Sequence, residues 1–259
     1  MSKNDNRTVI VTGAASGIGR GIAKRFGEKG DSVIVADIRR EPKQGKHYDT
    51  EVTEPTDEMI QSETAGNGTF IETDVSDPES VQDMIEQVIS QEETIDILVN
   101  NAGIFVEANT KETTIEEWQQ VIGVDLDGTF YCSKFAMPHL KQSEGNIINI
   151  GSVYSTEGGG VPSYAAAKAG VLNLTRDLAV ELGPHNVNVN IICPGFIKTP
   201  IADYLDEEDI QATIDHIPLG HGGVPKNIGD AAVLLASDEA NYIHGESLHV
   251  DGGWTSHRL

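Results

Sequence analysis

The chain has 259 residues, 38% of them hydrophobic, and carries 41 acidic against 18 basic residues, for a formal charge of −23. The composition is typical of a globular protein, and the acidic excess argues against nucleic acid or an anionic membrane surface as a partner, because both require basic patches. No apolar run approaches the roughly 20 residues of a membrane span, and the N-terminus lacks a signal-peptide pattern, so we expect a cytoplasmic protein.

The acidic residues are spread along the chain and do not form one tail. Such a surface repels itself at low ionic strength, and salt near 1 M relieves the repulsion by shortening the Debye length to about 3 Å. We therefore expect a halophilic protein; the alternative is an ordinary acidic one. Cys132 and Cys193 lie in apolar surroundings, which favours buried thiols over a disulfide. The histidines show no metal-ligand spacing, so no metal site is expected.

The first predicted elements are a strand, a glycine-rich turn and a helix. Residues 8–12 (TVIVT) are apolar enough for a buried strand, residues 13–19 (GAASGIG) follow directly, and residues 20–29 have the spacing of an amphipathic helix. Glycines let the backbone approach a pyrophosphate, and a helix N-terminus supplies free N–H groups. This order favours a dinucleotide-binding turn over a plain turn between strand and helix.

A second predicted strand covers residues 31–37 and ends in Asp37. A carboxylate at this point can accept hydrogen bonds from an adenosine ribose and repels a 2′-phosphate, which favours NAD over NADP. Arg39 and Arg40 follow closely and offer the opposite preference, and a simple turn residue is the alternative for Asp37. Residues 38–55 are polar and without periodicity, and we interpret them as an exposed insertion.

Further strands are predicted at 67–74, 96–99 and 147–150, alternating with a helix at 77–89 and with one long helix, or two, at 115–140. This alternation predicts an α/β protein with a doubly wound parallel sheet and helices on both faces. Ligands of such sheets bind at the carboxyl ends of the strands. The residues at or just beyond these ends are Gly13, Asp37, Asp74, Asn101 and Ser152.

The last third of the chain adds predicted strands at 188–193 and 247–250 and a helix at 227–237. Residues 196–219 form a polar, acid-rich segment of the length expected for a lid over the substrate. No repeat or linker interrupts the chain. We therefore predict a single domain, 1–259, with about seven strands.

Tyr164 and Lys168 are separated by three alanines, which predict a helix, and their spacing places the phenol and the ammonium on one helix face. A phenol with a pKa near ~10 is a poor base at neutral pH, but a neighbouring cation lowers that pKa. Ser152, at the end of a strand, can share a substrate oxygen with Tyr164. Alone, this pattern is weak, because a solvated helix face has the same spacing.

In this order, the motifs resemble the short-chain dehydrogenase/reductase family over about residues 7–253. The stretches that carry the resemblance are Thr12 to Gly19 (TGAASGIG), Asp74 with Val75, Asn100 to Gly103 (NNAG), Ser152, Tyr164 to Lys168 (YAAAK) and Pro194 to Thr199 (PGFIKT). The resemblance implies a Rossmann fold, a nicotinamide cofactor and a homo-oligomer, usually a tetramer.

The resemblance also implies roles for individual residues. Tyr164 is the implied acid/base, Ser152 holds the substrate oxygen, and Lys168 binds the nicotinamide ribose and lowers the pKa of the tyrosine. The implied cofactor-binding residues are Gly13, Ser16, Gly17, Ile18, Gly19, Asp37, Asp74, Val75, Asn101, Ala102, Gly103, Tyr164, Lys168, Pro194, Gly195, Ile197 and Thr199.

Two departures from the family pattern concern the catalytic residues. Asp125 stands in an apolar pattern where the family often has an asparagine thought to hold a relay water. A lone acid there is either partnered or functional; a carboxylate near Lys168 stabilises the ammonium, and Asp125 joins the catalytic candidates. Ser152 and Tyr164 are 12 positions apart, one fewer than in many members, which leaves Ser155 as a weaker candidate.

The favoured function is NAD-dependent interconversion of a secondary alcohol, such as a sugar, a polyol or a small hydroxy compound, with its carbonyl. The first alternative is reduction of a 3-oxoacyl thioester of carrier protein or CoA. The phosphates of that substrate favour a basic approach, whereas residues 201–216 contain six acids and no lysine or arginine. The second alternative is a non-catalytic cofactor-binding protein, against which the intact Ser152, Tyr164 and Lys168 argue.

Overall fold

Seven short strands form one parallel sheet in the computed structural model, which describes residues 6–256. They are β1 (Thr8–Thr12), β2 (Ser32–Asp37), β3 (Asn67–Glu72), β4 (Ile97–Asn100), β5 (Asn146–Ile150), β6 (Asn188–Pro194) and β7 (Ser247–Val250). Their order is β3-β2-β1-β4-β5-β6-β7, so the chain winds in opposite directions on the two sides of β1. The predicted doubly wound parallel sheet is confirmed.

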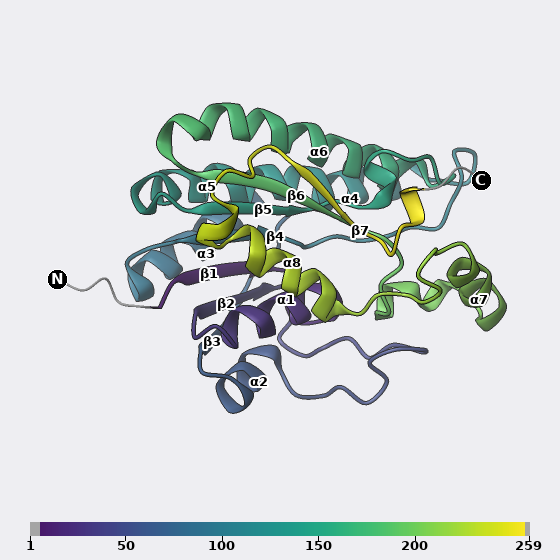
Figure 1. Ribbon diagram of the computed structural model, residues 1–259, viewed down its shortest axis with the longest axis horizontal. Coiled ribbons are helices and arrows are strands. Elements are labelled where there is room, and N and C mark those ends of the chain that lie inside the picture. Colours follow the sequence, from purple (N-terminus) through teal and green to yellow (C-terminus); the bar gives the residue numbers. More distant parts are fainter. Residues whose placement is uncertain (1–5, 257–259) are drawn as a thin grey trace.

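Helices cover both faces of this sheet (Figure 1). They are α1 (Gly17–Gly27), α2 (Thr56–Glu63), α3 (Pro78–Glu92), α4 (Ile115–Ile122), α5 (Gly128–Ser143), α6 (Pro162–Leu182), α7 (Glu207–Asp215) and α8 (Pro225–Leu235). One apolar cluster joins α1, α2 and α8 to one face, and a second joins α3, α5 and α6 to the other. None of the helices in residues 6–256 is long and apolar enough to cross a membrane.

The sequence of β1 is a continuous apolar run because both faces of this central strand are buried. Val9 and Val11 pack into the cluster on one face, and Ile10 packs into the cluster on the other. All three side chains are fully buried, and each stabilises the fold by about 1.5–3 kcal/mol relative to exposure. Because helices cover both faces, the strand has no polar side.

The chain reversal beside β1 positions the site. β1 pairs with β2 on one side and with β4 on the other, so the loops that leave β1 and β4 diverge to opposite faces. A crevice therefore forms at the carboxyl ends of these two strands, where ligands of such sheets bind. Gly13 follows β1 and Asn101 follows β4 at this crevice.

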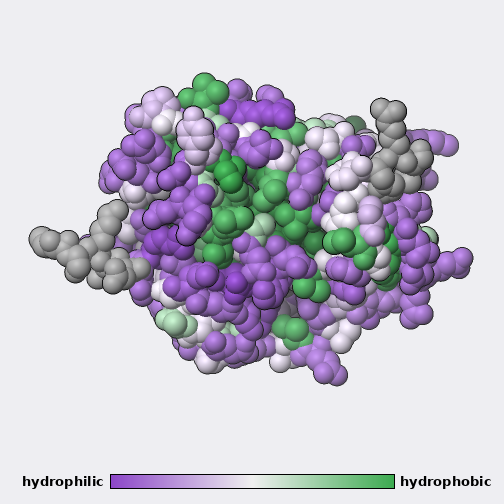
Figure 2. Space-filling view, viewed as in Figure 1, coloured by the Kyte–Doolittle hydropathy of each residue, from purple (hydrophilic) through white to green (hydrophobic). Residues whose placement is uncertain are grey.

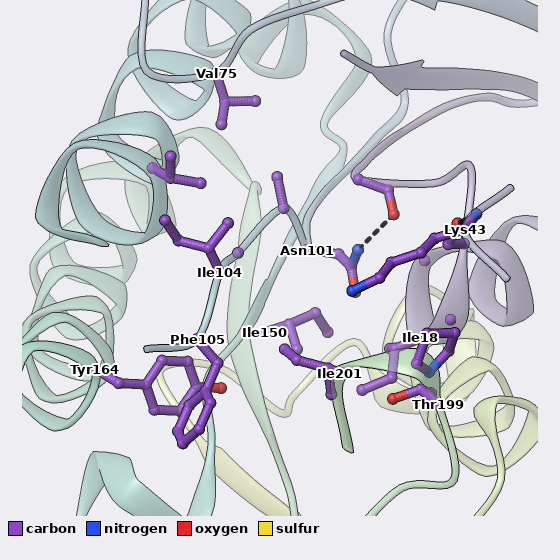
Figure 3. A pocket seen from close by; sticks show the side chains of 18 of the residues that line it. Ile18, Lys43, Val75, Asn101, Ile104, Phe105, Ile150, Tyr164, Thr199 and Ile201 are labelled. Atoms are coloured by element: carbon purple, nitrogen blue, oxygen red, sulfur yellow. Dashed lines mark hydrogen bonds between the residues drawn. The ribbon is translucent and has the colours of Figure 1, made fainter. Parts of the chain in front are cut away.

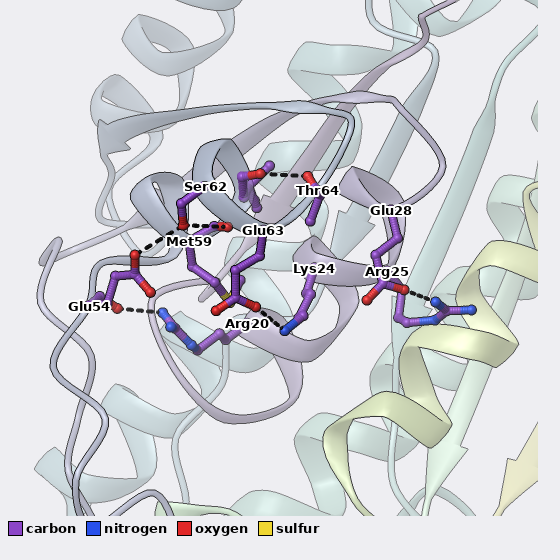
Figure 4. A network of polar contacts seen from close by, with 10 residues as sticks. Arg20, Lys24, Arg25, Glu28, Glu54, Met59, Ser62, Glu63 and Thr64 are labelled. Carbon is purple, nitrogen blue, oxygen red and sulfur yellow. Dashed lines mark hydrogen bonds and ion pairs between the residues drawn. The ribbon is translucent and has the colours of Figure 1, made fainter.

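Residues 38–55 contain no helix or strand, as expected from their lack of periodicity. The short helix α2 comes directly after them and was not anticipated, because only two adjacent apolar side chains, Met59 and Ile60, mark its buried face. Figure 4 shows how polar contacts attach this region to α1. The Arg20 guanidinium donates to the Glu54 carbonyl oxygen at 2.8 Å, and Lys24 forms an ion pair with Glu63.

Of the two alternatives for residues 115–140, one long helix or two, the structure has two helices. A single π-helical stretch, Gly123–Asp127, joins α4 to α5. Such a bulge inserts an extra residue into the helical repeat and is frequent at functional sites. Here it carries the Asp125 side chain into the interior, where it is completely buried.

The acid-rich segment at 196–219 forms a short 3₁₀ helix, Pro200–Tyr204, followed by α7. A parallel bridge between Ile197 and Gly223 closes its base. α7 has no buried residue, so this helix packs only loosely on the rest of the fold.

Both cysteines are buried free thiols, as predicted. Burial raises the pKa of the Cys132 thiol to about 12, which keeps it protonated and unreactive. Among residues 6–256, no group of three or more histidine, cysteine, aspartate or glutamate side chains is arranged to hold a metal ion.

Candidate active site

A pocket of about 1030 Å³ opens at the carboxyl ends of the sheet strands (Figure 3). Its wall includes residues at or just after the ends of five strands: Gly13, Asp37, Asn101, Ile150 and Pro194. Each residue named as a cofactor contact from the sequence lies on this wall. Of the four catalytic candidates, Ser152, Tyr164 and Lys168 also lie on it, whereas Asp125 does not.

The glycine-rich turn between β1 and α1 is locked by side chains from the other half of the sheet. Gly13 and Gly17 have φ values of +63° and +54°, which favour glycine. A Cβ at Gly19 would overlap the Gly13 carbonyl oxygen. The Asn101 amide donates to the Thr12 carbonyl oxygen at 2.8 Å and to that of Gly13 at 3.2 Å. The asparagine after β4 thus holds the turn after β1 in place.

The N-terminus of α1 fits a dinucleotide diphosphate. Ser16 is the N-cap residue, but its side chain makes no hydrogen bond to the first turn and instead accepts one from the Lys43 backbone N–H at 2.5 Å. The N–H groups of the first turn, at the positive end of the helix dipole, therefore have no capping side chain. Gly17, Ile18 and Gly19 line the pocket at this point. An anion bound there satisfies these groups.

Asp37 ends β2 on the same side of the pocket. Its Oδ2 accepts a hydrogen bond from the Ala15 backbone N–H at 2.9 Å. Partial burial raises the pKa of the Asp37 carboxyl, although this hydrogen bond lowers it. Arg39 lies on the pocket wall, but Arg40 forms ion pairs with Asp57 at 2.7 Å and with Glu58 and does not line the pocket. Only the first of the two arginines can reach a ligand.

Tyr164 projects from α6 into an aromatic part of the pocket (Figure 3). Phe105 meets its ring edge-on at a centroid distance of 5.2 Å, and the Lys168 ammonium lies 5.5 Å from its centroid. Desolvation raises the pKa of the phenol, and it does so more strongly than Lys168 and a hydrogen bond with Ser152 lower it. The expectation of a depressed tyrosine pKa is therefore wrong for this structure, although the lysine acts in the expected direction.

Ser152 follows β5 and begins a short 3₁₀ helix, Val153–Ser155. Its Oγ accepts a hydrogen bond from the Tyr154 backbone N–H at 3.2 Å, and its own N–H donates to Ser155 Oγ at 3.1 Å. Ser155 is buried and does not line the pocket. It acts as a local cap, so Ser152 is the serine that faces a ligand.

Asp125 is partnered beneath the pocket. One carboxylate oxygen lies 3.1 Å from the Lys168 ammonium, and the other accepts the Ile104 backbone N–H at 2.9 Å. Burial raises the pKa of the Asp125 carboxyl. Burial also opposes the charge on Lys168, but Asp125 and Tyr164 together raise the pKa of that lysine. A Cβ at Gly103 would lie 2.9 Å from the Asp125 carboxylate, so the glycine permits this close approach.

Several wall residues were not identified from the sequence. Phe105 stacks on Tyr204 from the acid-rich segment at a centroid distance of 4.8 Å, and Glu107 lies nearby on the wall. Phe105 comes two positions after the Asn-Asn-Ala-Gly motif, and this closeness to a strand-end motif could have indicated that it lines the pocket. Lys43 comes from the 38–55 insertion, where no pattern pointed to a ligand.

Comparisons with known proteins match this geometry. A family model described as enoyl-(acyl carrier protein) reductase matches residues 13–255. The meso-2,3-butanediol dehydrogenase of Serratia marcescens is 36% identical over 253 residues, 97% of this chain and 96% of that protein. The 3-oxoacyl-(acyl-carrier-protein) reductase of Thermotoga maritima is 36% identical over 251 residues, 96% of this chain and 98% of that protein.

A solved structure from Beutenbergia cavernae, described as a proposed NAD(P)-dependent gluconate 5-dehydrogenase with NADP bound at low occupancy, is also similar. It superposes with a TM-score of 0.87 at 33% identity, and the match covers 98% of this chain and 99% of that one. The family model, the relatives and the solved structure therefore each match almost the whole chain.

Removal of the Asp125 carboxylate tests the buried ion pair. In Asp125→Ala, the Lys168 ammonium keeps its hydrogen bond to the Ile150 carbonyl oxygen, at 3.2 Å, and its contact with the Tyr164 ring, but within residues 6–256 it has no carboxylate partner left. We expect the free energy of unfolding in urea at neutral pH to fall by about 3–5 kcal/mol, because a buried charge loses its partner. The matched control is Asp127→Ala in the same π turn, for which we expect a change within about 0.5 kcal/mol. Equal losses in the two variants would contradict the ion-pair account.

Proposed function

The chain belongs to the short-chain dehydrogenase/reductase family of nicotinamide-dependent oxidoreductases, and we propose that its substrate is a small secondary alcohol or the matching carbonyl. The enzyme interconverts the alcohol and the carbonyl by hydride transfer. The observation that carries the proposal is the position of Tyr164 and Ser152 in the same pocket as the uncapped N-terminus of α1. One cavity thus combines a proton-transfer group with a binding place for a dinucleotide.

When bound, the nicotinamide cofactor supplies the hydride acceptor or donor. In our proposal Tyr164 takes the hydroxyl proton during oxidation and returns it during reduction, because its phenol lies on the pocket wall. Ser152 orients the substrate oxygen through Oγ. Lys168 binds the nicotinamide ribose, and its charge favours the phenolate form of Tyr164. Asp125 acts on this chemistry through Lys168.

The part of the pocket wall around Tyr164 favours a compact substrate that is uncharged or polyhydroxylated. Phe105 and Tyr204 form its aromatic side, and Glu107 and Asp203 add acidic groups. Acidic groups repel the phosphates of a pantetheine arm, which disfavours the alternative of a 3-oxoacyl thioester. The similarity to a butanediol dehydrogenase supports a small diol or hydroxyketone, whereas the similarity to a 3-oxoacyl reductase keeps the thioester as the second candidate.

We propose that the whole chain acts as one domain and that its 196–219 segment is the lid over the substrate. The 3₁₀ helix Pro200–Tyr204 contributes four residues to the pocket wall, whereas the α7 helix that follows has no buried residue. The α7 part of the segment, which packs loosely on the fold, can move at little cost, whereas the 3₁₀ helix before it has buried residues.

NAD is the proposed cofactor, although the Beutenbergia cavernae structure holds NADP. The Asp37 carboxylate lies on the wall at the end of β2, where an adenosine ribose is bound in folds of this kind. A negative charge there repels a 2′-phosphate. Arg39 on the same wall attracts a 2′-phosphate and so weakens the preference for NAD, but the repulsion from Asp37 remains.

We further propose that the protein is a cytoplasmic homotetramer adapted to high salt. Apolar side chains gather in the middle of the face shown in Figure 2, over the region of β7 and α8, with hydrophilic residues around them. Exposed apolar residues on or near this part of the fold include Leu234 and Ile243. Subunit contacts that cover such a patch remove apolar surface from water. The charge of −23 supports the salt adaptation.

Tyr164→Phe tests the assignment of the acid/base. We expect turnover of a secondary alcohol, followed by nicotinamide absorbance, to fall by about 10²–10⁴-fold, because the ring remains but the transferable proton is lost. Calorimetric NAD affinity should stay within about twofold. The control is Tyr154→Phe, which removes a neighbouring phenol outside the pocket wall and should retain most of the turnover. Full activity of Tyr164→Phe would refute the assignment, and an inactive wild type that binds NAD would support a non-catalytic protein.

Asp37→Asn tests the cofactor preference. Loss of the charge removes the repulsion of a 2′-phosphate, so the ratio of kcat/KM with NADP to kcat/KM with NAD should rise by about tenfold or more. The control is Asp74→Asn, on the same wall after the next strand, which should affect both cofactors alike. A ratio unchanged in Asp37→Asn would mean that this carboxylate does not set the preference.

A KCl series tests the salt adaptation and the assembly together. Between about 0.1 M and about 1 M KCl, we expect the unfolding temperature to rise, because screening weakens the repulsion among surface carboxylates. Light scattering in the same series should give about four times the chain mass at high salt. An unfolding temperature that does not rise would count against halophily, and a monomer at every salt concentration would refute the tetramer.

A further inference from the structure

The 38–55 segment, which joins β2 to α2, lies against both halves of the pocket. At its centre, the Lys43 backbone N–H donates to Ser16 Oγ in the glycine-rich turn at 2.5 Å. A few residues later, the Lys46 backbone N–H donates to the Asp203 carboxylate of the lid segment at 2.9 Å. The 38–55 segment, in which no motif was found, is therefore bonded to the site at two points.

These anchors are supported by ring and carbonyl contacts further along the segment. The His47 ring nitrogen Nε2 lies 3.0 Å from the Leu205 carbonyl oxygen, and the Tyr48 ring meets Phe196 edge-on at a centroid distance of 6.4 Å. The Arg20 contact with the Glu54 carbonyl oxygen fixes the far end of the segment against α1. The position of Lys43 is thus set by its own backbone bond to Ser16 and by the contacts of the residues that follow it.

The Lys43 side chain lies on the pocket wall and extends past the glycine-rich turn into the cavity (Figure 3). Within residues 6–256, no carboxylate forms an ion pair with its ammonium. Lys168, the other lysine on the wall, is paired with Asp125. Lys43 is therefore a cation directed into a cavity without an anionic partner from this part of the chain.

Acidic side chains surround Lys43 on the pocket wall, so a cation there offsets the repulsion of an anionic ligand. Four carboxylates stand on the same wall, at Asp37, Asp74, Glu107 and Asp203, in a chain whose formal charge is −23. A dinucleotide brings two phosphate charges into this field. The N-terminus of α1 offsets part of the repulsion, and an ammonium beside it adds a full positive charge at the same place.

We propose that Lys43 binds the diphosphate of the nicotinamide cofactor, so that the 38–55 segment is part of the cofactor site. The inference rests on the proposed function only for the identity of the ligand. Its backbone bond to Ser16 places Lys43 beside the N-terminus of α1, where a diphosphate binds, and its side chain extends into the cavity past this turn; Asp37, which accepts the Ala15 N–H, marks the adjoining ribose end. Because both cofactors carry the diphosphate, a contact there predicts the same effect on NAD and NADP.

Displacement of NADH fluorescence tests this assignment without any turnover. Four competitors are compared: NAD, NADP, ADP-ribose, which keeps the diphosphate but lacks nicotinamide, and adenosine, which lacks phosphate. In Lys43→Met, the Kd values of the first three should rise by the same factor, about three- to tenfold, and that of adenosine should not change. The factor should shrink in molar KCl because salt screens an exposed charge.

Two further variants complete the test. Lys46→Met removes a lysine of the same segment that does not line the pocket, and it should bind all four competitors as the wild type does. Lys43→Arg keeps the charge and should retain most of the affinity. Unchanged NAD affinity in Lys43→Met would overturn the proposal, and a loss confined to NADP would move the lysine to the 2′-phosphate. An equal loss for adenosine would indicate a displaced segment, which also overturns it. A wild type that binds no dinucleotide would instead refute the proposed function itself.

Discussion

The buried ion pair between Asp125 and Lys168 is the interaction on which the catalytic half of the pocket depends. The lysine ties α6 to the end of β5 through the Ile150 carbonyl oxygen, and the aspartate ties the π turn to the loop after β4 through the Ile104 N–H. A buried charge tolerates little displacement of its partner. The ion pair therefore fixes the distance between Tyr164, one helical turn before the lysine, and the strand end that carries the serine.

The cofactor half is built by a different physical device, the close approach of backbones. Gly13 and Gly19 allow the turn after β1 to lie against the loop after β4, and the Asn101 amide closes the gap with hydrogen bonds to main-chain carbonyl oxygens. Apart from Asp37, whose carboxylate accepts the Ala15 N–H, this turn is built from uncharged groups, and the N-terminus of α1 has no capping side chain. A rigid ionic centre thus places the proton-transfer group, whereas a backbone turn, with Lys43 beside it in our proposal, receives the phosphates.

Positions that depend on local pattern and topology could be predicted from the sequence. Strand ends such as Asp37 and Asn101 follow apolar runs, and a parallel sheet brings all such ends to one edge, so the pocket could be predicted without coordinates. Positions that depend on tertiary contacts could not be predicted in the same way. The π turn at Asp125 has no local signal, although the apolar pattern around this aspartate indicated that it needs a partner or has a function. The position of Lys43 depends on a loop that folds back over the glycine-rich turn. The net pKa shift of Tyr164 depends on desolvation, which spacing alone does not reveal.

The strand order determines when β1 can pair on both edges during synthesis on the ribosome. β1, β2 and β3 can pair as soon as they emerge, but the other edge of β1 pairs with β4, whose residues Ile97–Asn100 are made about 85 positions later. Until then the central strand has one unpaired edge, and Asn101 is not present to hold the glycine-rich turn. Contacts of such long sequence separation slow folding. A nascent chain that already contains the whole phosphate-binding turn therefore lacks the hydrogen bonds that hold this turn until β4 and Asn101 have also been made.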